Sequence, residues 1–229
     1  MKTLILLTLI QGLFLQVINA DGIRPASLEY DTLQLPENLA RERTDLIKKG
    51  LALSKEHGWL RYTFGSADPE KGGLDCSGAL YFLLRKSGLE PPRSSSAQYL
   101  WVRENSTFTE VGKSITSLDN PIFENLLPGD LLFWSGTYHP TDHRKTQVSH
   151  AAIYAGKDAN GTHIMLNSSD GRTYLRKKQS GYGIFEFRLP SATSKSTFVG
   201  FGTPPGLIAE PQSDSNSSPQ EEQKDPSGS

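Results

Sequence analysis

Apolar residues recur at helical spacing in the first half of the chain and at strand spacing in the second half. The helical pattern predicts helices over 37–57, 76–87 and 94–101. After residue 128, short apolar or alternating runs bounded by Gly, Asp, Asn and Pro predict strands over 131–134, 148–154, 163–167, 184–189 and 197–201. Helices that come first and strands that come later predict an α+β domain, with helices packed on a central antiparallel sheet.

The two ends of the chain differ in composition from the part between them. A positive start at Lys2, an apolar run over 4–15 and a small-residue exit at 18–20 predict a signal peptide over 1–20. We therefore expect export to the periplasm or the exterior, not as a lipoprotein, because no cysteine follows the signal. Residues 21–44 form a polar lead-in, 45–205 form one domain, and 206–229 form an acidic tail rich in Pro and Ser that is predicted to be disordered.

Charge excludes some classes of partner. The chain has 24 Lys and Arg against 25 Asp and Glu, a net charge of −1. Since nucleic-acid binding needs a concentrated basic face, we expect no nucleic-acid partner. After the signal, no stretch approaches the ~20 apolar residues of a membrane span, so none is expected.

Cys76 is the only cysteine, and it joins a glycine-rich turn to the predicted helix over 76–87. A thiol at the start of a helix faces unpaired backbone N–H groups and the positive end of the helix dipole, and both favour the reactive thiolate. The alternative is a buried structural cysteine, because cysteine is among the most buried residue types. A thiol without a disulfide partner in an exported chain favours the nucleophile.

A thiol nucleophile needs a base, and the base needs a third group that fixes its tautomer. His150 lies in a predicted strand among small residues, and alternation puts Val148 and His150 on one face. On the next predicted strand, His163 and Asn167 share a face, and either could orient the His150 ring. The alternative for His150 is an ordinary core histidine.

A further signal comes from four segments that follow one another along the chain. They lie at 74–78 (Leu-Asp-Cys-Ser-Gly), 92–98 (Pro-Arg-Ser-Ser-Ser-Ala-Gln), 127–133 (Leu-Pro-Gly-Asp-Leu-Leu-Phe) and 150–154 (His-Ala-Ala-Ile-Tyr). Together they resemble the NlpC/P60 family of cell-wall cysteine peptidases over about residues 45–190. The resemblance implies a papain-like core with Cys76 as the nucleophile, His150 as the base and Asn167 as the third catalytic residue. Many family members have histidine at that third position, and His163 is the alternative.

The resemblance also implies residues that contact the substrate. Tyr62 matches a tyrosine that lines the site in the family, and Asp75, Ser77, Arg93 and Ser95 match positions that bind the free amine and the carboxylates of the peptide. Other roles stay open at this stage. Tyr62 could be a core aromatic residue, Asp75 could cap the helix, and Arg93 could pair with a surface acid.

The function that the resemblance implies is hydrolysis of peptidoglycan stem peptides, between γ-linked D-glutamate and a diamino acid, through a thiolate and an acyl-enzyme. The alternatives are a CHAP-like N-acetylmuramoyl-L-alanine amidase and a non-catalytic wall-binding protein with the same fold. No cofactor or metal is expected. The insert over 135–146 contains His139, Asp142 and His143, and we interpret it as a polar surface loop that forms a wall of the cleft.

Overall fold

The computed structural model describes residues 22–141 and 144–208. The predicted signal peptide, residues 209–229 of the predicted tail, and Asp142 and His143 lie outside the described residues. Helices α1 (Arg41–Glu56), α2 (Cys76–Lys86) and α3 (Ser95–Asn105) precede the long strands. The order of elements confirms the predicted α+β class.

The main sheet has six strands in the order β4-β9-β5-β6-β7-β8, and all neighbouring pairs are antiparallel. Its strands are β4 (Phe108–Glu110), β5 (Leu131–Ser135), β6 (Val148–Lys157), β7 (His163–Tyr174), β8 (Lys177–Glu186) and β9 (Thr197–Gly202). Short 3-10 helices lie at η1 (Tyr30–Thr32), η2 (Pro69–Lys71) and η3 (Pro121–Phe123). Each predicted strand corresponds to one of β5 to β9, although β8 begins seven residues before the predicted start at 184.

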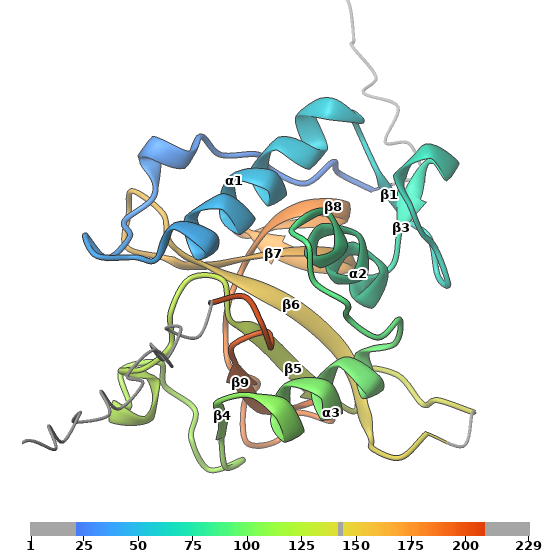
Figure 1. Ribbon diagram of the computed structural model, residues 1–229. Helices are drawn as coiled ribbons and strands as arrows, with labels where there is room; N and C mark the ends of the chain where they lie inside the picture. The colour runs from blue at the N-terminus through green and yellow to red at the C-terminus, as the bar shows by residue number, and fades with distance from the viewer. Residues whose placement is uncertain (1–21, 142–143, 209–229) are drawn as a thin grey trace, which may run out of the picture.

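Both faces of the main sheet are covered, which is why β5 and β6 carry nearly continuous buried runs. One face packs against the helices, in a cluster that includes Leu80 of α2, Ile153 of β6 and Leu166 of β7. The other face is covered by the segment over 111–126 in a mainly aromatic cluster around Trp134. Figure 1 shows β6 crossing the middle of the molecule, with α1 and α2 beside β7 and β8, and α3 beside β4, β5 and β9.

A second, three-stranded sheet leads the chain into α2. It pairs β1 (Arg61–Tyr62), β3 (Gly73–Leu74) and β2 (Ala67–Asp68) in the order β1-β3-β2. The hydroxyl of Ser168 in β7 donates a 2.6 Å hydrogen bond to the carbonyl oxygen of Leu74. This bond fixes the end of β3 against the main sheet, and α2 begins two residues later.

The register of β6 corrects one prediction about its faces. Trp134 of β5 is opposite His150, but the next residue, Ser135, is opposite Val148, so Ser149 is an extra residue in β6. This bulge turns Val148 to the helix-covered face, where it joins the first cluster. Alternation had predicted that Val148 and His150 share a face, and the prediction is wrong because periodicity alone does not detect a bulge.

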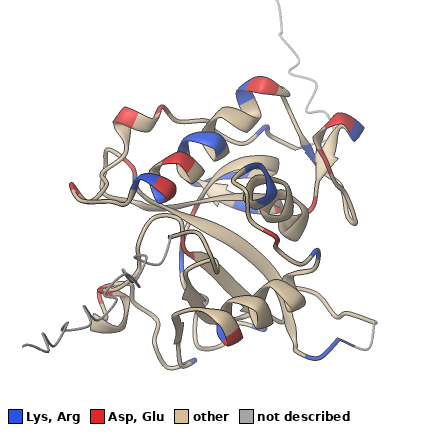
Figure 2. Cartoon of the chain, viewed as in Figure 1, with Lys and Arg blue, Asp and Glu red and all other residues tan. Residues whose placement is uncertain are grey.

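Charged side chains of both signs are interspersed along the chain, as Figure 2 shows for α1. In the described ranges, no helix combines the length and the apolar character that crossing a membrane requires. Within the same ranges, no three His, Cys, Asp or Glu side chains form a group that could hold a metal ion.

Candidate active site

Cys76 is the first residue of α2, and the turn before it fits only a specific set of residues. Asp75 is the N-cap of α2, and its carboxylate accepts a 2.6 Å hydrogen bond from the backbone N–H of Gly78. A Cβ on Gly78 would overlap the carbonyl oxygen of Ser66, so only glycine allows the helix to approach the preceding loop this closely. In the sequence Asp-Cys-Ser-Gly, the aspartate therefore caps the helix, the cysteine supplies the thiol, and the glycine allows the close backbone contact.

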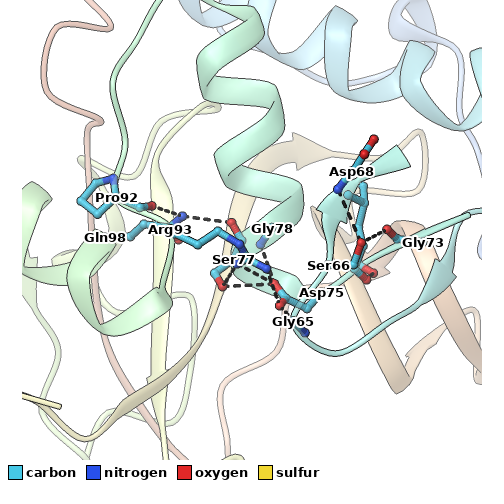
Figure 3. Close-up of polar contacts among 12 residues, drawn as sticks. Gly65, Ser66, Asp68, Gly73, Asp75, Ser77, Gly78, Pro92, Arg93 and Gln98 are labelled. Atoms are coloured by element: carbon cyan, nitrogen blue, oxygen red, sulfur yellow. Dashed lines mark hydrogen bonds and ion pairs between the residues drawn. The ribbon is translucent and has the colours of Figure 1, made fainter. Parts of the chain in front are cut away.

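The Asp75 carboxylate is buried and accepts hydrogen bonds on both oxygens (Figure 3). Its Oδ1 accepts from the Gly78 N–H, from the Ser77 hydroxyl at 3.1 Å and from Arg93 Nη1 at 3.1 Å. Its Oδ2 accepts from the Gly65 N–H and from Arg93 Nη2, both at 2.8 Å. Arg93 thus pairs with Asp75 itself rather than with a surface acid. This bidentate pair joins the loop before α3 to the start of α2.

Gln98 is a residue of this network to which sequence reasoning gave no role. Its side chain is fully buried, and Nε2 donates 3.0 Å hydrogen bonds to the carbonyl oxygens of Ser77 and Pro92. The first of these holds α3 against the first turn of α2, and the second fixes the segment that carries Arg93. The available signal was its place at the end of the segment over 92–98 that carries the family resemblance.

Strand β6 links the surroundings of the thiol to those of the imidazole. The backbone N–H groups of Ala151 and Ser77 hydrogen-bond to the Cys76 sulfur, and Ala151 directly follows His150 in β6. The His150 ring is buried, and its Nε2 lies 2.7 Å from the side-chain amide of Asn167 in β7. The structure therefore brings together the three residues that the sequence predicted as catalytic.

His163 occupies a different place. Its Nδ1 lies 2.8 Å from the hydroxyl of Tyr154, and in the sheet register it is opposite Lys157, four residues along β7 from Asn167. Of the two candidates for the third position, Asn167 contacts His150 and His163 does not. The strand pleat puts the side chains of His163 and Asn167 on one face of β7. Only the pairing register with β6 determines which of the two lies next to His150.

Burial favours the neutral forms of both reactive groups in the free protein. It raises the pKa of the Cys76 thiol to about 11, and the adjacent Asp75 charge acts in the same direction. The two backbone N–H groups and Arg172 oppose this increase in the thiol pKa without offsetting it. Burial and the Arg172 charge also hold the pKa of His150 well below its usual range. The prediction that the helix start yields a thiolate neglected this desolvation.

Two cavities that share lining residues, Tyr62 and Tyr138 among them, lie at the site. The smaller, of about 260 Å³, is lined by Cys76 and by all five residues that the sequence predicted as substrate contacts: Tyr62, Asp75, Ser77, Arg93 and Ser95. The larger, of about 630 Å³, is lined by His150 and Arg172. Tyr138, from the insert over 135–146, lines both cavities, so that the insert forms a wall of the cleft.

Tyr62 also lines both cavities. Burial, followed by the charges of Cys76 and Asp75, raises the pKa of the Tyr62 hydroxyl, so the phenol stays protonated at neutral pH. It can donate a hydrogen bond to a ligand in the cleft. Tyr62 is therefore not simply a core aromatic residue, because it is only partly buried.

Trp134 and Arg172 are near the reactive pair and were not predicted from the sequence. The Trp134 ring meets the His150 ring edge to face, with 5.5 Å between centroids. The Arg172 guanidinium lies over the Trp134 ring, with its Cζ 4.5 Å from the ring centroid. The strand predicted from the sequence ended at 167, whereas β7 continues to Tyr174, so no signal for Arg172 was available in the sequence.

Comparison with known proteins identifies the class to which this fold and site belong. The model of the NlpC/P60 family matches residues 58–185, more than half of the chain, and the chain belongs to this family. The predicted family resemblance is thereby confirmed.

Individual relatives share part of their length with this chain. It is 30% identical over 133 residues to the "Gamma-DL-glutamyl hydrolase" of Bacillus subtilis (strain 168), covering 55% of this chain and 26% of that protein. It is 31% identical over 121 residues to the "Bifunctional muramidase/DL-endopeptidase CwlT" of the same organism, covering 53% and 29%. The match thus spans little more than a quarter of each relative. An NlpC/P60 family protein from Bacillus cereus aligns in structure with a TM-score of 0.42 and 22% identity, covering 77% of this chain and 43% of that one.

Proposed function

We propose that this protein is an exported cysteine peptidase that hydrolyses peptidoglycan stem peptides, at the bond between γ-linked D-glutamate and a diamino acid. The observation that carries the proposal is the arrangement of the Cys76 thiol, the His150 imidazole and the Asn167 amide in a cleft. The names of the two Bacillus subtilis relatives, a γ-DL-glutamyl hydrolase and a DL-endopeptidase, support the choice of bond.

The reaction would begin from the neutral pair. As the sulfur of Cys76 attacks the scissile carbonyl carbon, its proton passes to His150. The carbonyl oxygen takes the negative charge, and the unpaired backbone N–H groups at the start of α2 stabilise it. Because burial disfavours an ion pair in the free site, proton transfer accompanies attack rather than preceding it.

Asn167 sets the tautomer of His150 in this scheme. If the amide oxygen accepts a hydrogen bond from Nε2–H, the ring keeps Nδ1 unprotonated and free to take the thiol proton. If the amide instead donates to Nε2, the proton sits on Nδ1 and the ring cannot act as a base there. In the structure Nδ2 of Asn167 is the atom that lies 2.7 Å from Nε2, and the buried Oδ1 has no hydrogen-bond partner among the described residues. Turning the amide over exchanges the two atoms, and catalysis requires the orientation in which Oδ1 accepts from Nε2–H.

The second half of the reaction reverses the proton transfer. The imidazolium of His150 gives its proton to the leaving amine as the carbon–nitrogen bond breaks, which leaves a thioester on Cys76. A water molecule, deprotonated by His150, then adds to the thioester carbonyl. Breaking of the carbon–sulfur bond releases the D-glutamyl carboxylate and restores the thiol.

The test is digestion of purified peptidoglycan by the mature protein, with mass spectrometry of the new ends. We expect new amino ends on the diamino acid, their loss in Cys76→Ala, and near wild-type digestion by His163→Ala as a matched control on β7. New muramic acid ends would identify an amidase instead. An unchanged wall that still retains the protein would identify a wall-binding module. Circular dichroism of each variant checks that it folds.

A further inference from the structure

Two aromatic side chains that are exposed to solvent line both cavities of the candidate active site. Phe64 is 74% exposed, more than any other large apolar side chain in the described part of the chain, and Tyr138 is 36% exposed. Their rings meet edge to face, with 6.0 Å between the centroids, and we call Phe64 and Tyr138 the aromatic pair. An apolar ring that faces water in the wall of a cavity is a favourable contact for an apolar part of a ligand.

Phe64 is held in this position by a tight turn. The backbone N–H of Ser66 donates a 3.0 Å hydrogen bond to the carbonyl oxygen of Thr63, and Gly65 within the turn has a φ of +80°. This bond, with a left-handed glycine at the third position, is the pattern of a type II turn that has Phe64 at its second position. The N–H of Gly65 donates to the Asp75 carboxylate at 2.8 Å (Figure 3), so the turn is joined to the start of α2.

Tyr138 is held by contacts with β6. The hydroxyl of Ser149, the extra residue of the β6 bulge, accepts a 3.1 Å hydrogen bond from the backbone N–H of Thr137 and lies 2.7 Å from the Thr137 hydroxyl. Arg144 donates to the Tyr138 hydroxyl at 3.0 Å and to the carbonyl oxygen of Val148 at 3.1 Å. Hydrogen bonds to the bulged part of β6 therefore fix the Tyr138 ring in the wall of the cleft.

The scissile bond must lie next to the aromatic pair. Cys76 lines the smaller cavity and His150 lines the larger one, so a bond that both side chains reach lies where the two cavities share their walls. Phe64 and Tyr138 belong to those shared walls. They therefore face the groups of the substrate that are directly beside the scissile carbonyl.

The chemistry beside that carbonyl depends on how the acyl residue is linked. In a γ-linked D-glutamyl residue, two unbranched methylene groups precede the carbonyl carbon. In an α-linked residue, a branched carbon that bears an amide N–H precedes it. A phenyl ring has no acceptor that would replace the water lost by such an N–H, whereas it packs favourably on methylene groups.

We propose that the aromatic pair binds the two methylene groups of the γ-linked residue and thereby positions its carbonyl carbon at Cys76. This inference rests on the proposed function, and it identifies Phe64 and Tyr138 as specificity-determining residues of the same site.

The experiment compares two synthetic peptides that differ by one methylene group, L-Ala-γ-D-Glu-diaminopimelate and L-Ala-β-D-Asp-diaminopimelate, by their kcat/KM. One methylene group in an apolar site changes kcat/KM by about 10- to 200-fold. We expect the wild type to prefer the first peptide at least about 10-fold, and Phe64→Ala and Tyr138→Ala each to lose most of that preference. Phe64→Leu keeps an apolar side chain and should retain part of it.

Tyr81→Ala is the matched control. Tyr81 is a partly buried residue of α2 with the Arg85 guanidinium 5.6 Å from its ring centroid, much as Arg144 lies 5.5 Å from the ring centroid of Tyr138. It lines neither of the two cavities. Its replacement should therefore leave both the activity and the preference unchanged.

Three outcomes would overturn the inference. One is equal kcat/KM for the two peptides in the wild type. Another is an equal loss for both peptides in Phe64→Ala and Tyr138→Ala, which would mean that the aromatic pair only supports the local structure. The third comes from calorimetric binding of both peptides to Cys76→Ala, if that protein binds them equally.

A failure of the proposed function would look different. Neither peptide would be cleaved, yet Cys76→Ala would bind the γ-D-Glu peptide more tightly, and Cys76→Ala/Phe64→Ala would bind the two peptides equally. That result would overturn the proposed function while supporting the role of the aromatic pair.

Discussion

Replacing Asp75 by asparagine would remove its charge and keep a side chain that caps helices as well as aspartate does. The change isolates the ion pair with Arg93, in which the Nη2–Oδ2 distance is 2.8 Å and the two side chains are 37% and 9% exposed. Fully exposed pairs contribute about 0–1 kcal/mol, and hydrogen bonds to charged groups contribute about 1.5–3 kcal/mol. For this half-buried bidentate pair we expect about 2 kcal/mol.

Matched variants separate the ion pair from the cap. Asp75→Ala loses both, and since a cap contributes ~1 kcal/mol, it should lower the free energy of unfolding by about 3 kcal/mol. Arg93→Gln should cost about 2 kcal/mol, and the double variant Asp75→Asn/Arg93→Gln should also cost about 2 kcal/mol, because the pair is lost only once. In a domain of this size each kcal/mol corresponds to about 2–4 °C in Tm, so Asp75→Asn should melt about 4–8 °C below the wild type.

The assay is urea unfolding followed by circular dichroism, with the wild type and the four variants at one pH between 7 and 8. The coupling energy is the difference between the sum of the single-variant costs and the cost of the double variant. A coupling energy below about 0.5 kcal/mol would refute the reasoning, because it would put the pair among exposed surface ion pairs. Equal stability of Asp75→Asn and Asp75→Ala would refute the capping role of residue 75.

Three further predictions concern the reactive residues. Asn167→Ala should lower kcat by about 10- to 100-fold. Asn167→Asp should lower kcat less, because it keeps an acceptor, and His163→Ala should lower it least. The reverse ranking in steady-state assays would contradict the placement of Asn167. Because burial depresses the pKa of His150, the unfolded chain binds a proton that the folded one does not, and stability should fall as pH drops below about 6.5, by at most ~1.4 kcal/mol per pH unit. Urea unfolding of His150→Gln should show a smaller loss over this range, and a slope equal to the wild type's would contradict the assignment. Iodoacetamide should alkylate Cys76 at pH 7.5 more slowly than free cysteine, because burial raises its pKa to about 11, and faster alkylation would show a preformed thiolate.

The elements with strong local signals were predicted well from the sequence. Helix α2 was predicted from 76 to 87 and spans Cys76–Lys86, because a capping aspartate, an apolar face and Gly88 mark its two ends. β5 follows a Pro-Gly-Asp turn and β6 follows a polar insert, so their starts were also clear. In the site, the residues alone left His163 and Asn167 open as the third group, the family resemblance favoured Asn167, and Asn167 is the one that contacts His150.

The start of β8 had no such signal. The strand begins with polar residues at 177–180, and it forms because it pairs with β7 across a two-residue turn. Leu175 and Arg176 in that turn have φ values of 49° and 63°, a conformation that usually calls for Asn-Gly. The lead-in segment then covers the strand, through bridges from Ile23 to Gln179 and from Ala26 to Ile184. These are contacts distant in sequence, which a local pattern does not contain.

The chemistry of the site depends on such distant contacts as well. A helix start alone predicts a thiolate at Cys76, but the sulfur is enclosed by β6, and desolvation exceeds the effect of the N–H groups. Arg172 was missed because the predicted strand ended at 167, whereas pairing with the first half of β8 extends β7 to Tyr174. Both errors come from treating an element by itself, when the packing of one element on another decides the charge state.

Two arginines, Arg93 and Arg172, act on the charge balance around Cys76, where the Asp75 carboxylate is next to the nucleophile. Asp75 is required to cap α2, yet its charge raises the pKa of the thiol that follows it. Arg93 reduces that penalty by pairing with both carboxylate oxygens, while Arg172, which has no such partner in the described chain, lowers the pKa of the thiol from the other side. Because the same charge also lowers the pKa of His150, Arg172 favours the thiolate while it opposes the imidazolium, and it therefore does not promote an ion pair between Cys76 and His150.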